Sequence, residues 1–494
     1  MAVPSEALAA AMSVVDKTPK GLYIDGEWRA GQGGAVLAVE DPATGSTVAE
    51  VADASVEDGL AALAAAARAQ SAWAATPPRE RGEVLRRAFD LIIEGRDDLA
   101  RMMTLEMGKA FAESQAEVGY AAEFLRWFAE EAVRIDGGYL TAPAGGSRVV
   151  VMRQPVGPCL LVTPWNFPMA MGTRKIGPAL AAGCTVVVKP AKQTPLSMLA
   201  LVEILEQAGL PRGVVNVLTT SQSGRVTSAL LADDRLRKLS FTGSTPVGRT
   251  LLAQSADRVL RTSMELGGNA PFIVFDDADL DLAVEGAVQA KMRNVGEACT
   301  AANRFYVQRS VAERFVGGLA ERLGGLRLGH GLDPSTEVGP LIDRAAVASV
   351  AELVGDATRA GASVVTGGGP IAGEGYFFAP TVLSGVPDGA RAVREEIFGP
   401  VAPVVVFDDE DEAVGRANAS EYGLAAYVFT ENLGRGLRVT ERLESGMVGL
   451  NQGIISNPAA PFGGVKQSGL GREGGKVGID EYLNVKYAAV RASW

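Results

Sequence analysis

A cysteine and a glutamate carry the clearest chemistry in this chain. Cys299 lies in the run Asn294–Arg304 (NVGEACTAANR), where small and polar residues surround it in place of the aliphatic neighbours of a core cysteine. Glu265 lies upstream, between Met264 and Leu266 in the run MELGGNAP. A thiolate is a strong nucleophile, and a carboxyl group whose pKa is raised by an apolar pocket can act as a general base. The pair therefore indicates covalent catalysis.

The chain has one histidine, His330. It lies between Gly329 and Gly331, and this glycine-flanked stretch predicts a surface loop. A histidine-based mechanism has this single candidate, so acid–base work otherwise falls to a carboxylate, and Glu265 is the first choice. The other two cysteines, Cys159 and Cys184, are interpreted as small buried apolar residues.

Composition and charge limit the class of protein. A chain of 494 residues is too long for one compact core and predicts about two or three domains. The net charge of −11, without a block of basic residues, argues against a nucleic-acid or anionic-membrane partner. Three cysteines are too few for a disulfide framework, which predicts a reducing, cytoplasmic location. No apolar run reaches the ~18 residues of a membrane span, and no signal-peptide pattern is expected at the N-terminus.

The segment from 157 to 267 predicts a parallel sheet. Short β-branched apolar runs alternate there with helical patterns. Strands are expected at 159–163, 185–189, 214–218 and 238–242, and helices at 169–182, 197–208, 224–232 and 247–257. Four successive βα units favour a mostly parallel sheet with helices on both faces, similar to a dinucleotide-binding layer.

Further helices are expected upstream of this segment, and a second α/β domain downstream. The upstream helices are predicted at 56–73, 78–108 and 118–135. The downstream strands are predicted at 272–275, 304–307, 363–366, 403–407 and 425–429, with helices such as 311–323 and 345–360. The second domain is expected to start near the pair Gly267-Gly268, where glycine permits a sharp change of direction.

Two extended segments, at 138–154 and 480–494, lie outside these units. A C-terminal strand carrying Tyr482, Val485, Tyr487 and Val490 leaves an edge exposed unless another strand pairs with it. A partner subunit is the natural cover, so a homodimer or homotetramer is expected. The predicted organisation is a dinucleotide-binding domain at 1–137 and 155–266, a catalytic domain at 267–475, and oligomerisation arms at 138–154 and 476–494.

Seven motifs occur in a fixed order along the chain. They are PWNFP at 164–168, Lys189-Pro190, FTGSTPVGR at 241–249, MELGG at 264–268, Cys299, EEIFGP at 395–400 and PFGG at 461–464. In this order and spacing the chain resembles the aldehyde dehydrogenase superfamily over essentially its whole length. The resemblance implies an α/β fold with a Rossmann-type cofactor domain, an α/β catalytic domain and a small β oligomerisation arm.

The resemblance assigns three catalytic roles. Cys299 is the implied nucleophile, and Glu265 is the implied base that activates water to hydrolyse the thioester. The side-chain amide of Asn166 and the backbone N–H of Cys299 are the implied oxyanion donors. Asn166 is also a typical turn residue, and both readings can hold together. Glu297 is closer to Cys299 in sequence, but side chains two residues apart do not face each other on a helix, so adjacency does not make it the partner.

The resemblance also implies a nicotinamide cofactor, NADP or NAD, and no metal site is visible. The run Gly243–Gly248 follows an expected strand and opens a helix, an arrangement whose free N–H groups suit a pyrophosphate. Lys189 is implied to reach the adenosine ribose and Glu396 the nicotinamide ribose. Lys192 stands where NAD-preferring relatives often place a glutamate, so NADP is expected to bind at least as well as NAD, unless this lysine points into solvent. The full implied cofactor set is Trp165, Lys189, Pro190, Ala191, Lys192, Gly243, Ser244, Gly248, Glu396 and Phe398.

Further runs resemble the succinate-semialdehyde dehydrogenase subfamily. They are NFPMAMGTRK at 166–175, NQGIISN at 451–457 and GGVKQSGLGREG at 463–474. In that subfamily the residues at Arg174, Arg293 and Ser456 bind the distal carboxylate of the substrate, and arginine can grip a carboxylate with two hydrogen bonds. The expected reaction is oxidation of succinate semialdehyde to succinate. Glutarate semialdehyde or another short aldehyde acid is the nearest alternative, and a non-catalytic relative that kept the fold is the alternative of a different class.

Overall fold

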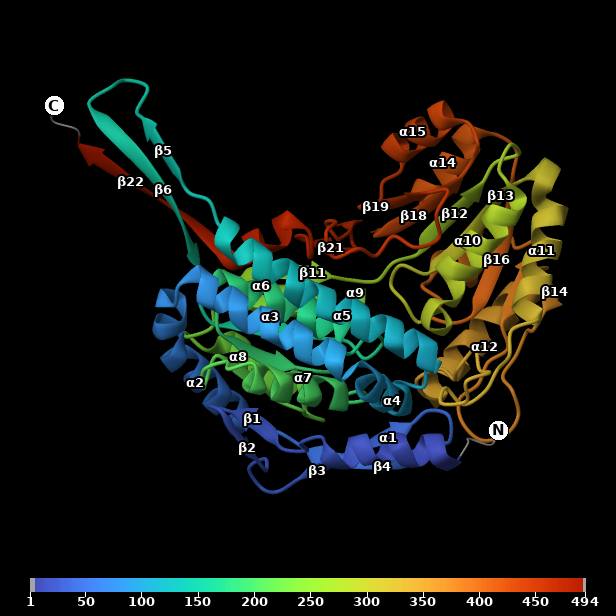
Figure 1. The fold of residues 1–494 in the computed structure, drawn as a ribbon. Helices are drawn as coiled ribbons and strands as arrows, with labels where there is room; N and C mark the ends of the chain where they lie inside the picture. Colours follow the sequence, from blue (N-terminus) through green and yellow to red (C-terminus); the bar gives the residue numbers. More distant parts are fainter. Residues whose placement is uncertain (1–4, 492–494) are drawn as a thin grey trace.

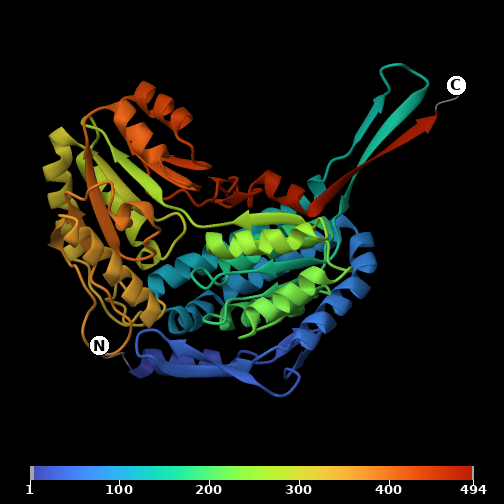
Figure 2. The same ribbon diagram turned by 180° about the vertical axis from the view of Figure 1, so that it is seen from behind.

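Two large β-sheets, each covered by helices, and a projecting three-stranded arm form the molecule (Figure 1). The computed structural model describes residues 5–491. None of the helices in this range combines the length and hydropathy that crossing a membrane requires. The arm lies on the side of the first sheet that faces away from the second sheet, as both views show (Figures 1 and 2).

The first sheet contains the four predicted βα units. Its eight strands have the order β2-β1-β9-β8-β7-β10-β11-β21, and the five from β9 to β11 are parallel. Every residue of strands β7 to β10 is buried, because helices cover both faces of the sheet. Only β7 is a continuous apolar run, whereas β9 and β10 also bury polar residues such as Asn216 and Ser240. The elements of this segment are β7 (Cys159–Val162), α6 (Ala170–Ala182), β8 (Val186–Lys189), α7 (Leu196–Gln207), β9 (Val215–Val217), α8 (Ser223–Ala232), β10 (Lys238–Thr242), α9 (Thr245–Ala256) and β11 (Arg261–Glu265).

Of the helices upstream of this sheet, α3, α4 and α5 pack against one another and against α6 or α7, whereas α2 packs against α8, β8 and β9. They are α2 (Val56–Ala75), α3 (Pro78–Glu94), α4 (Arg96–Met107) and α5 (Phe111–Glu131), followed by η1 (Ala132–Arg134). The predicted continuous helix at 78–108 is wrong, because the chain breaks at Gly95 into α3 and α4. Glycine weakens a helix interior, and Asp97 and Asp98 favour the start of a new helix at that point.

Elements at the N-terminus extend the first sheet and pack beneath it. The hydrophobic pattern of residues 5–52 does not predict these elements, because their strands are short or half-exposed. Strand β1 pairs with β9 through Tyr23 and Val217, which adds an antiparallel hairpin to the parallel sheet. These elements are α1 (Ser5–Lys17), β1 (Leu22–Ile24), β2 (Glu27–Arg29), β3 (Val36–Asp41) and β4 (Ser46–Ala52).

The second sheet has seven strands in the order β14-β15-β16-β13-β12-β18-β19. All five strands predicted downstream are present, and β15 and β19 are additional. The strands are β12 (Ala270–Val274), β13 (Ala302–Gln308), β14 (Ser363–Thr366), β15 (Thr381–Ser384), β16 (Val401–Phe407), β18 (Ala425–Phe429) and β19 (Met447–Leu450). The helices of this part are α10 (Leu280–Met292), η2 (Arg293–Gly296), η3 (Arg309–Val311), α11 (Ala312–Gly324), α12 (Arg344–Arg359), α13 (Arg391–Arg394), α14 (Glu410–Asn418) and α15 (Leu433–Arg442).

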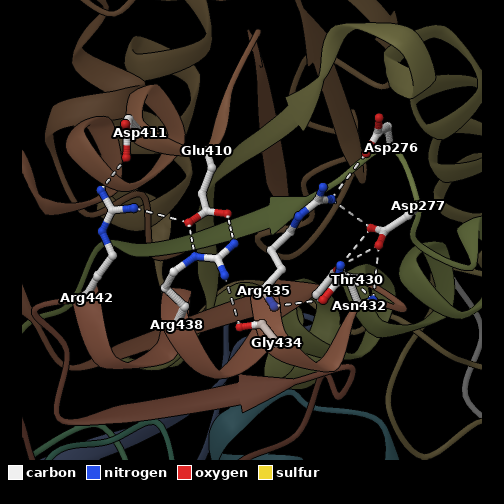
Figure 3. Close-up of polar contacts among 10 residues, drawn as sticks. All are labelled: Asp276, Asp277, Glu410, Asp411, Thr430, Asn432, Gly434, Arg435, Arg438 and Arg442. Atoms are coloured by element: carbon white, nitrogen blue, oxygen red, sulfur yellow. Dashed lines mark hydrogen bonds and ion pairs between the residues drawn. The ribbon is translucent and has the colours of Figure 1, made fainter.

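Helix α15 is held by a row of arginines on one face (Figure 3). Arg438 forms two hydrogen bonds, of 2.8 and 2.7 Å, with Glu410 at the start of α14. Arg435 lies 3.0 Å from Asp277, just beyond β12. These ion pairs join α15, which connects β18 to β19, to the start of α14 and to the loop after β12.

The arm is an antiparallel sheet in the order β22-β6-β5. Its strands are β5 (Gly138–Thr141), β6 (Ser147–Pro155) and β22 (Leu483–Arg491), and β22 pairs with β6 from end to end. The predicted extended stretch starts later than 480, because the 3-10 helix η4 (Lys476–Tyr482) precedes β22. Of the remaining short strands, β17 (Tyr422–Gly423) pairs with β20 (Val465–Lys466), and β21 (Gly469–Leu470) pairs with β11 at the edge of the first sheet.

The predicted surface position of His330 is wrong, because this residue is buried with 2% exposure. Its Nε2 lies 3.0 Å from an oxygen of Asp41 at the end of β3, and its Nδ1 accepts a hydrogen bond from the Leu332 N–H. A Cβ atom on Gly331 would lie 2.3 Å from the Lys109 carbonyl oxygen. The flanking glycine therefore permits close packing of two backbones, a use of glycine that local sequence does not distinguish from a loop.

Candidate active site

One cavity gathers most of the residues that the sequence singled out. It lies where the carboxyl ends of β7, β10 and β11 face the loop after α10, which is the usual place for ligands in parallel α/β sheets. Its lining includes Trp165, Asn166, Arg174, Gly243, Ser244, Glu265, Arg293, Cys299, Glu396, Phe398 and Ser456. The predicted cofactor residues outside this lining are Lys189, Pro190, Ala191, Lys192 and Gly248.

A strained loop presents Cys299 to the cavity. Asn294, Val295 and Gly296 have consecutive positive φ angles of 53°, 58° and 79°. This conformation is costly for a β-branched residue such as Val295, so the surrounding structure must hold it. A Cβ on Gly296 would lie 2.3 Å from the Gly399 carbonyl oxygen, so only glycine fits there. The loop leaves the Cys299 side chain partly exposed while its neighbours are buried.

The surroundings of Cys299 favour the neutral thiol over the thiolate. Burial raises its pKa to about 12, and the nearby carboxyl groups of Glu396 and Glu265 act in the same direction. The guanidinium groups of Arg174 and Arg293 oppose this shift. The nucleophile therefore needs a base or an added positive charge to form the thiolate.

The amide of Asn166 points at the same loop. Its Nδ2 donates to the Glu297 carbonyl over 2.9 Å, and its Oδ1 accepts from the Phe167 N–H. The Asn166 carbonyl oxygen accepts from Lys109 Nζ at 2.8 Å and from Asn294 Nδ2 at 3.1 Å. The side-chain amide is thus bonded to Glu297, two residues before Cys299 in the chain. Hydrogen bonds at both Nδ2 and Oδ1 fix its orientation.

Glu265 ends strand β11 and is buried, with 2% exposure. Its Oε2 is buried without a hydrogen-bond partner among the described residues. Burial raises the pKa of this carboxyl well above its usual range, and the charge of Glu473 raises it further. Gly463 packs so closely that a Cβ there would lie 2.9 Å from Glu265 Oε1. A buried carboxyl with a raised pKa is a stronger base than an exposed one and can serve as a general base.

The two predicted substrate arginines have different surroundings. Arg174, on α6, is buried and forms an ion pair of 2.6 Å with Glu473. Arg293 donates to Ser456 Oγ over 2.9 Å, and its guanidinium carbon lies 4.7 Å from the centre of the Phe167 ring. Across residues 5–491, Arg293 has no carboxylate within ion-pairing distance. Arg293 therefore has the more available positive charge.

Glu473 was missed by sequence reasoning. It also pairs with Lys175, which is 298 residues away along the chain. A glutamate in the glycine-rich run before the C-terminus is typical of a surface loop, and nothing local indicates a buried position with two cations. The pairing depends on the C-terminal segment folding back over α6, which only the tertiary structure reveals.

Two of the predicted cofactor residues, Lys189 and Glu396, come from different parts of the chain, at the end of β8 and just after α13 (Arg391–Arg394). Lys189 ends β8, and its Nζ donates to the Pro190 carbonyl at 3.0 Å and to Ser223 Oγ at 3.1 Å. Burial lowers the pKa of Lys189 to about 8. Glu396 accepts from the Gly268 N–H over 3.1 Å, and burial raises its pKa to about 7. Lys192 is exposed.

The start of α9 fits an anionic group. Its N-cap residue, Ser244, makes no side-chain hydrogen bond to the helix, so the first N–H groups lack a side-chain cap. Such groups, at the positive end of a helix, suit a pyrophosphate. A Cβ on Gly248 would lie 2.4 Å from Leu266, so glycine allows α9 to approach β11 closely. Within residues 5–491, no group of three or more His, Cys, Asp or Glu side chains is arranged to hold a metal.

Known proteins match nearly the whole chain. A sequence profile of the aldehyde dehydrogenase family matches residues 28–488. A succinate-semialdehyde dehydrogenase of Paenarthrobacter nicotinovorans is 59% identical, over 90% of this chain and 98% of the relative. A glutarate-semialdehyde dehydrogenase of Pseudomonas aeruginosa is 52% identical, over 94% of this chain and 96% of the relative.

Solved structures confirm the predicted fold class. The crystal structure of an E. coli NADP dependent enzyme superposes with a TM-score of 0.95 at 50% identity, covering 97% of this chain and 99% of the other. The profile match and the two relatives agree with this result. The chain therefore belongs to the aldehyde dehydrogenase family.

Proposed function

We propose that this enzyme oxidises succinate semialdehyde to succinate with NADP or NAD through a thioester on Cys299. The observation that carries the proposal is that Cys299, Glu265 and Arg293 line one cavity, and that Arg293 has no carboxylate partner among the described residues. The names of the two relatives add support, since both act on short aldehydes that carry a distal carboxylate.

The first half of the reaction forms a covalent bond to the aldehyde. The Cys299 thiol loses its proton to solvent, and the thiolate sulfur then attacks the carbonyl carbon, so that the carbonyl oxygen becomes the oxyanion of a thiohemiacetal. Asn166 Nδ2 and the Cys299 N–H are the donors for this oxyanion. When bound, the oxidised nicotinamide would supply the acceptor for the hydride that leaves the thiohemiacetal carbon, and its positive charge would favour the Cys299 thiolate. Loss of hydride leaves the acyl group on Cys299 as a thioester.

The second half releases the acid. The Glu265 carboxylate takes a proton from a water molecule, and the resulting hydroxide adds to the thioester carbonyl. The tetrahedral adduct collapses and expels the Cys299 thiolate, which leaves the carboxylic acid as product. The raised pKa of Glu265 makes it a stronger base than an ordinary carboxylate, and its Oε2, which has no hydrogen-bond partner within residues 5–491, is available to accept the proton.

The cavity suits a small substrate. Its volume is about 240 Å³, which is below the ~300–1,000 Å³ typical of sites for drug-sized ligands. Arg293, Ser456 and Arg174 are the proposed partners of the distal carboxylate. Glutarate semialdehyde is one methylene longer and remains the second candidate, because one methylene in a pocket changes binding by only ~1–3 kcal/mol.

Arg293→Ala tests the carboxylate site. We expect kcat/KM for succinate semialdehyde to fall roughly 10- to 100-fold, because a hydrogen bond to a charged group contributes about 1.5–3 kcal/mol. Absorbance of the reduced nicotinamide gives the rate. The control substrate is propanal, which lacks the distal carboxylate. Because propanal makes no contact with Arg293 through a carboxylate, its kcat/KM should fall less than about 3-fold in the variant. An equal loss on both aldehydes would mean that Arg293 only supports the loop.

Lys192 is the proposed contact for the 2′-phosphate of NADP. We expect the wild type to bind NADP at least as tightly as NAD, and Lys192→Glu to weaken NADP binding roughly 3- to 10-fold. The effect is modest because Lys192 is exposed and its charge is screened by solvent. Fluorescence titration with both cofactors measures it, with NAD as the internal control. Wild-type binding of NAD more than about 10-fold tighter than NADP would refute the assignment.

The arm is the proposed site of oligomerisation, as a homodimer or homotetramer. Strand β22 pairs only with β6 among the described residues, and its Val485 and Tyr487 are each 69% exposed. An open strand edge with exposed apolar side chains favours pairing with another chain. Light scattering distinguishes the two sizes.

A cytoplasmic location is also proposed, and it is supported by three cysteines that are all free thiols.

A further inference from the structure

A polar network that the proposed mechanism does not use lies behind the nucleophile loop. Glu113, in the first turn of α5, accepts a hydrogen bond of 2.6 Å from the Asn294 backbone N–H through Oε1. Its other oxygen, Oε2, is buried without a hydrogen-bond partner among the described residues. Asn294 is the first of the three residues with positive φ before Cys299. The carboxylate of Glu113 therefore contacts the loop where its unusual backbone begins.

The Asn294 side chain connects this loop to Asn166. Its Nδ2 donates to the Asn166 carbonyl at 3.1 Å and to the Glu297 carbonyl at 3.0 Å. Asn166 Nδ2 donates to the same Glu297 carbonyl at 2.9 Å. These three bonds close a ring among Asn166, Asn294 and Glu297, and Cys299 lies two residues beyond the ring. The separation of the oxyanion amide from the nucleophile is thus set through Asn294.

A second support fixes the Asn166 side of the ring. Lys109 Nζ donates to the Asn166 carbonyl at 2.8 Å and forms a buried ion pair with Glu117. Glu117 in turn accepts from the Met169 and Ala170 N–H groups at 3.1 and 3.2 Å, at the start of α6. Helix α5 therefore supports both sides of the ring. Glu117 holds Asn166 through Lys109, and Glu113 holds the loop that begins at Asn294.

The geometry assigns Glu113 and Asn294 as positioning residues for aldehyde oxidation: Glu113 holds Asn294 in its left-handed conformation, and the Asn294 amide sets the distance between Asn166 and Cys299. This inference rests on the proposed function. The reason is physical. A left-handed Asn294 followed by a left-handed Val295 is strained, and the short, partly buried hydrogen bond from the Asn294 N–H to Glu113 Oε1 opposes relaxation of the loop. A shift of about 1 Å in such a site can cost ~100-fold in rate.

Three variants separate positioning from simple support of the fold. In Glu113→Ala the acceptor is lost, whereas Glu113→Gln keeps an oxygen that can accept the same N–H. Asn294→Gly removes the amide but keeps a residue that adopts positive φ freely. The control is Asp409→Ala, which removes a carboxylate bonded to a backbone N–H, that of Glu412 at 2.9 Å, at the start of α14. Thermal unfolding of each variant measures its folded fraction.

Two activities provide the readout. The first is kcat and KM for succinate semialdehyde, and the second is hydrolysis of p-nitrophenyl acetate, which needs the thiol and oxyanion donors but neither cofactor nor an aldehyde. We expect kcat of folded Glu113→Ala and Asn294→Gly to fall roughly 10- to 100-fold with KM changed less than about 3-fold. Ester hydrolysis should fall in parallel, Glu113→Gln should stay within about 3-fold of wild type, and Asp409→Ala should keep the wild-type kcat.

The outcomes are distinguishable from failure of the proposed function. If the wild type does not oxidise succinate semialdehyde but Glu113→Ala and Asn294→Gly still lose ester hydrolysis, the substrate assignment fails and the positioning role stands. If both variants keep the wild-type kcat, or if Glu113→Gln is as impaired as Glu113→Ala, the positioning role is overturned. Should Glu113→Ala not fold, unchanged rates in folded Asn294→Gly overturn it.

Discussion

Cys299→Ala is expected to lower kcat/KM for aldehyde oxidation by roughly 10⁴-fold or more, because every later step of the reaction passes through a bond to this sulfur. The absorbance of the reduced nicotinamide measures the loss. Cofactor affinity should remain, since the cofactor contacts proposed on Lys189 and Glu396 do not involve the thiol. Fluorescence titration of the variant with NADP tests that expectation.

Cys184→Ala is the matched control for the nucleophile. Cys184 is fully buried and its thiol donates to the Tyr482 carbonyl at 3.4 Å, away from the cavity lining. Removal of this buried thiol in Cys184→Ala should lower the free energy of unfolding and leave kcat near the wild-type value. Oxidation that survives in Cys299→Ala would mean that aldehyde and cofactor react directly, without a covalent intermediate.

Glu265→Gln is expected to stop turnover after one cycle. Without a base, hydrolysis of the thioester should slow roughly 10²- to 10⁴-fold, while formation of the thioester continues. Rapid mixing should then show a burst of about one reduced nicotinamide per active site, followed by a slow steady state. Glu106→Gln is the control, because Glu106 is a buried carboxyl whose pKa is raised to about 7 but which caps α7 instead of lining the cavity.

The pH dependence of the steady state gives the same residue a second test. Burial raises the pKa of Glu265 well above its usual range, and only the carboxylate form can accept a proton from water. The wild-type hydrolysis rate should therefore fall as pH drops through this raised pKa and rise as pH increases. Glu265→Gln should lose this dependence. A Glu265→Gln enzyme with the wild-type steady state and pH profile would assign the base to another residue.

Much of the fold was predictable because its signals are local. The four βα units between 159 and 256 carry buried β-branched strands, and the observed bounds differ from the predicted ones by about two residues or fewer. Gly95 and His330 were misread for one reason. Glycine serves helix breaks, loops and close backbone contacts alike, and the neighbouring sequence does not say which use applies.

The site was predictable to a different degree. The resemblance named Cys299, Glu265, Asn166, Arg174, Arg293 and Ser456, and these residues do line one cavity. Their catalytic and binding roles remain predictions that the variants above address. Glu473 and Glu113 escaped notice because their contacts join residues that are far apart, such as Glu113 and Asn294 at a separation of 181. The left-handed backbone at Val295 gave no sequence signal, since valine normally avoids it.

Mass spectrometry of the trapped acyl-enzyme tests the central claim most directly. Glu265→Gln would be mixed with succinate semialdehyde and oxidised cofactor, quenched in acid and digested. The mechanism predicts one succinyl group per chain, located on the peptide that contains Cys299 and formed only when the cofactor is present. Release of reduced nicotinamide without an adduct, or an adduct on any other residue, would contradict covalent oxidation at Cys299.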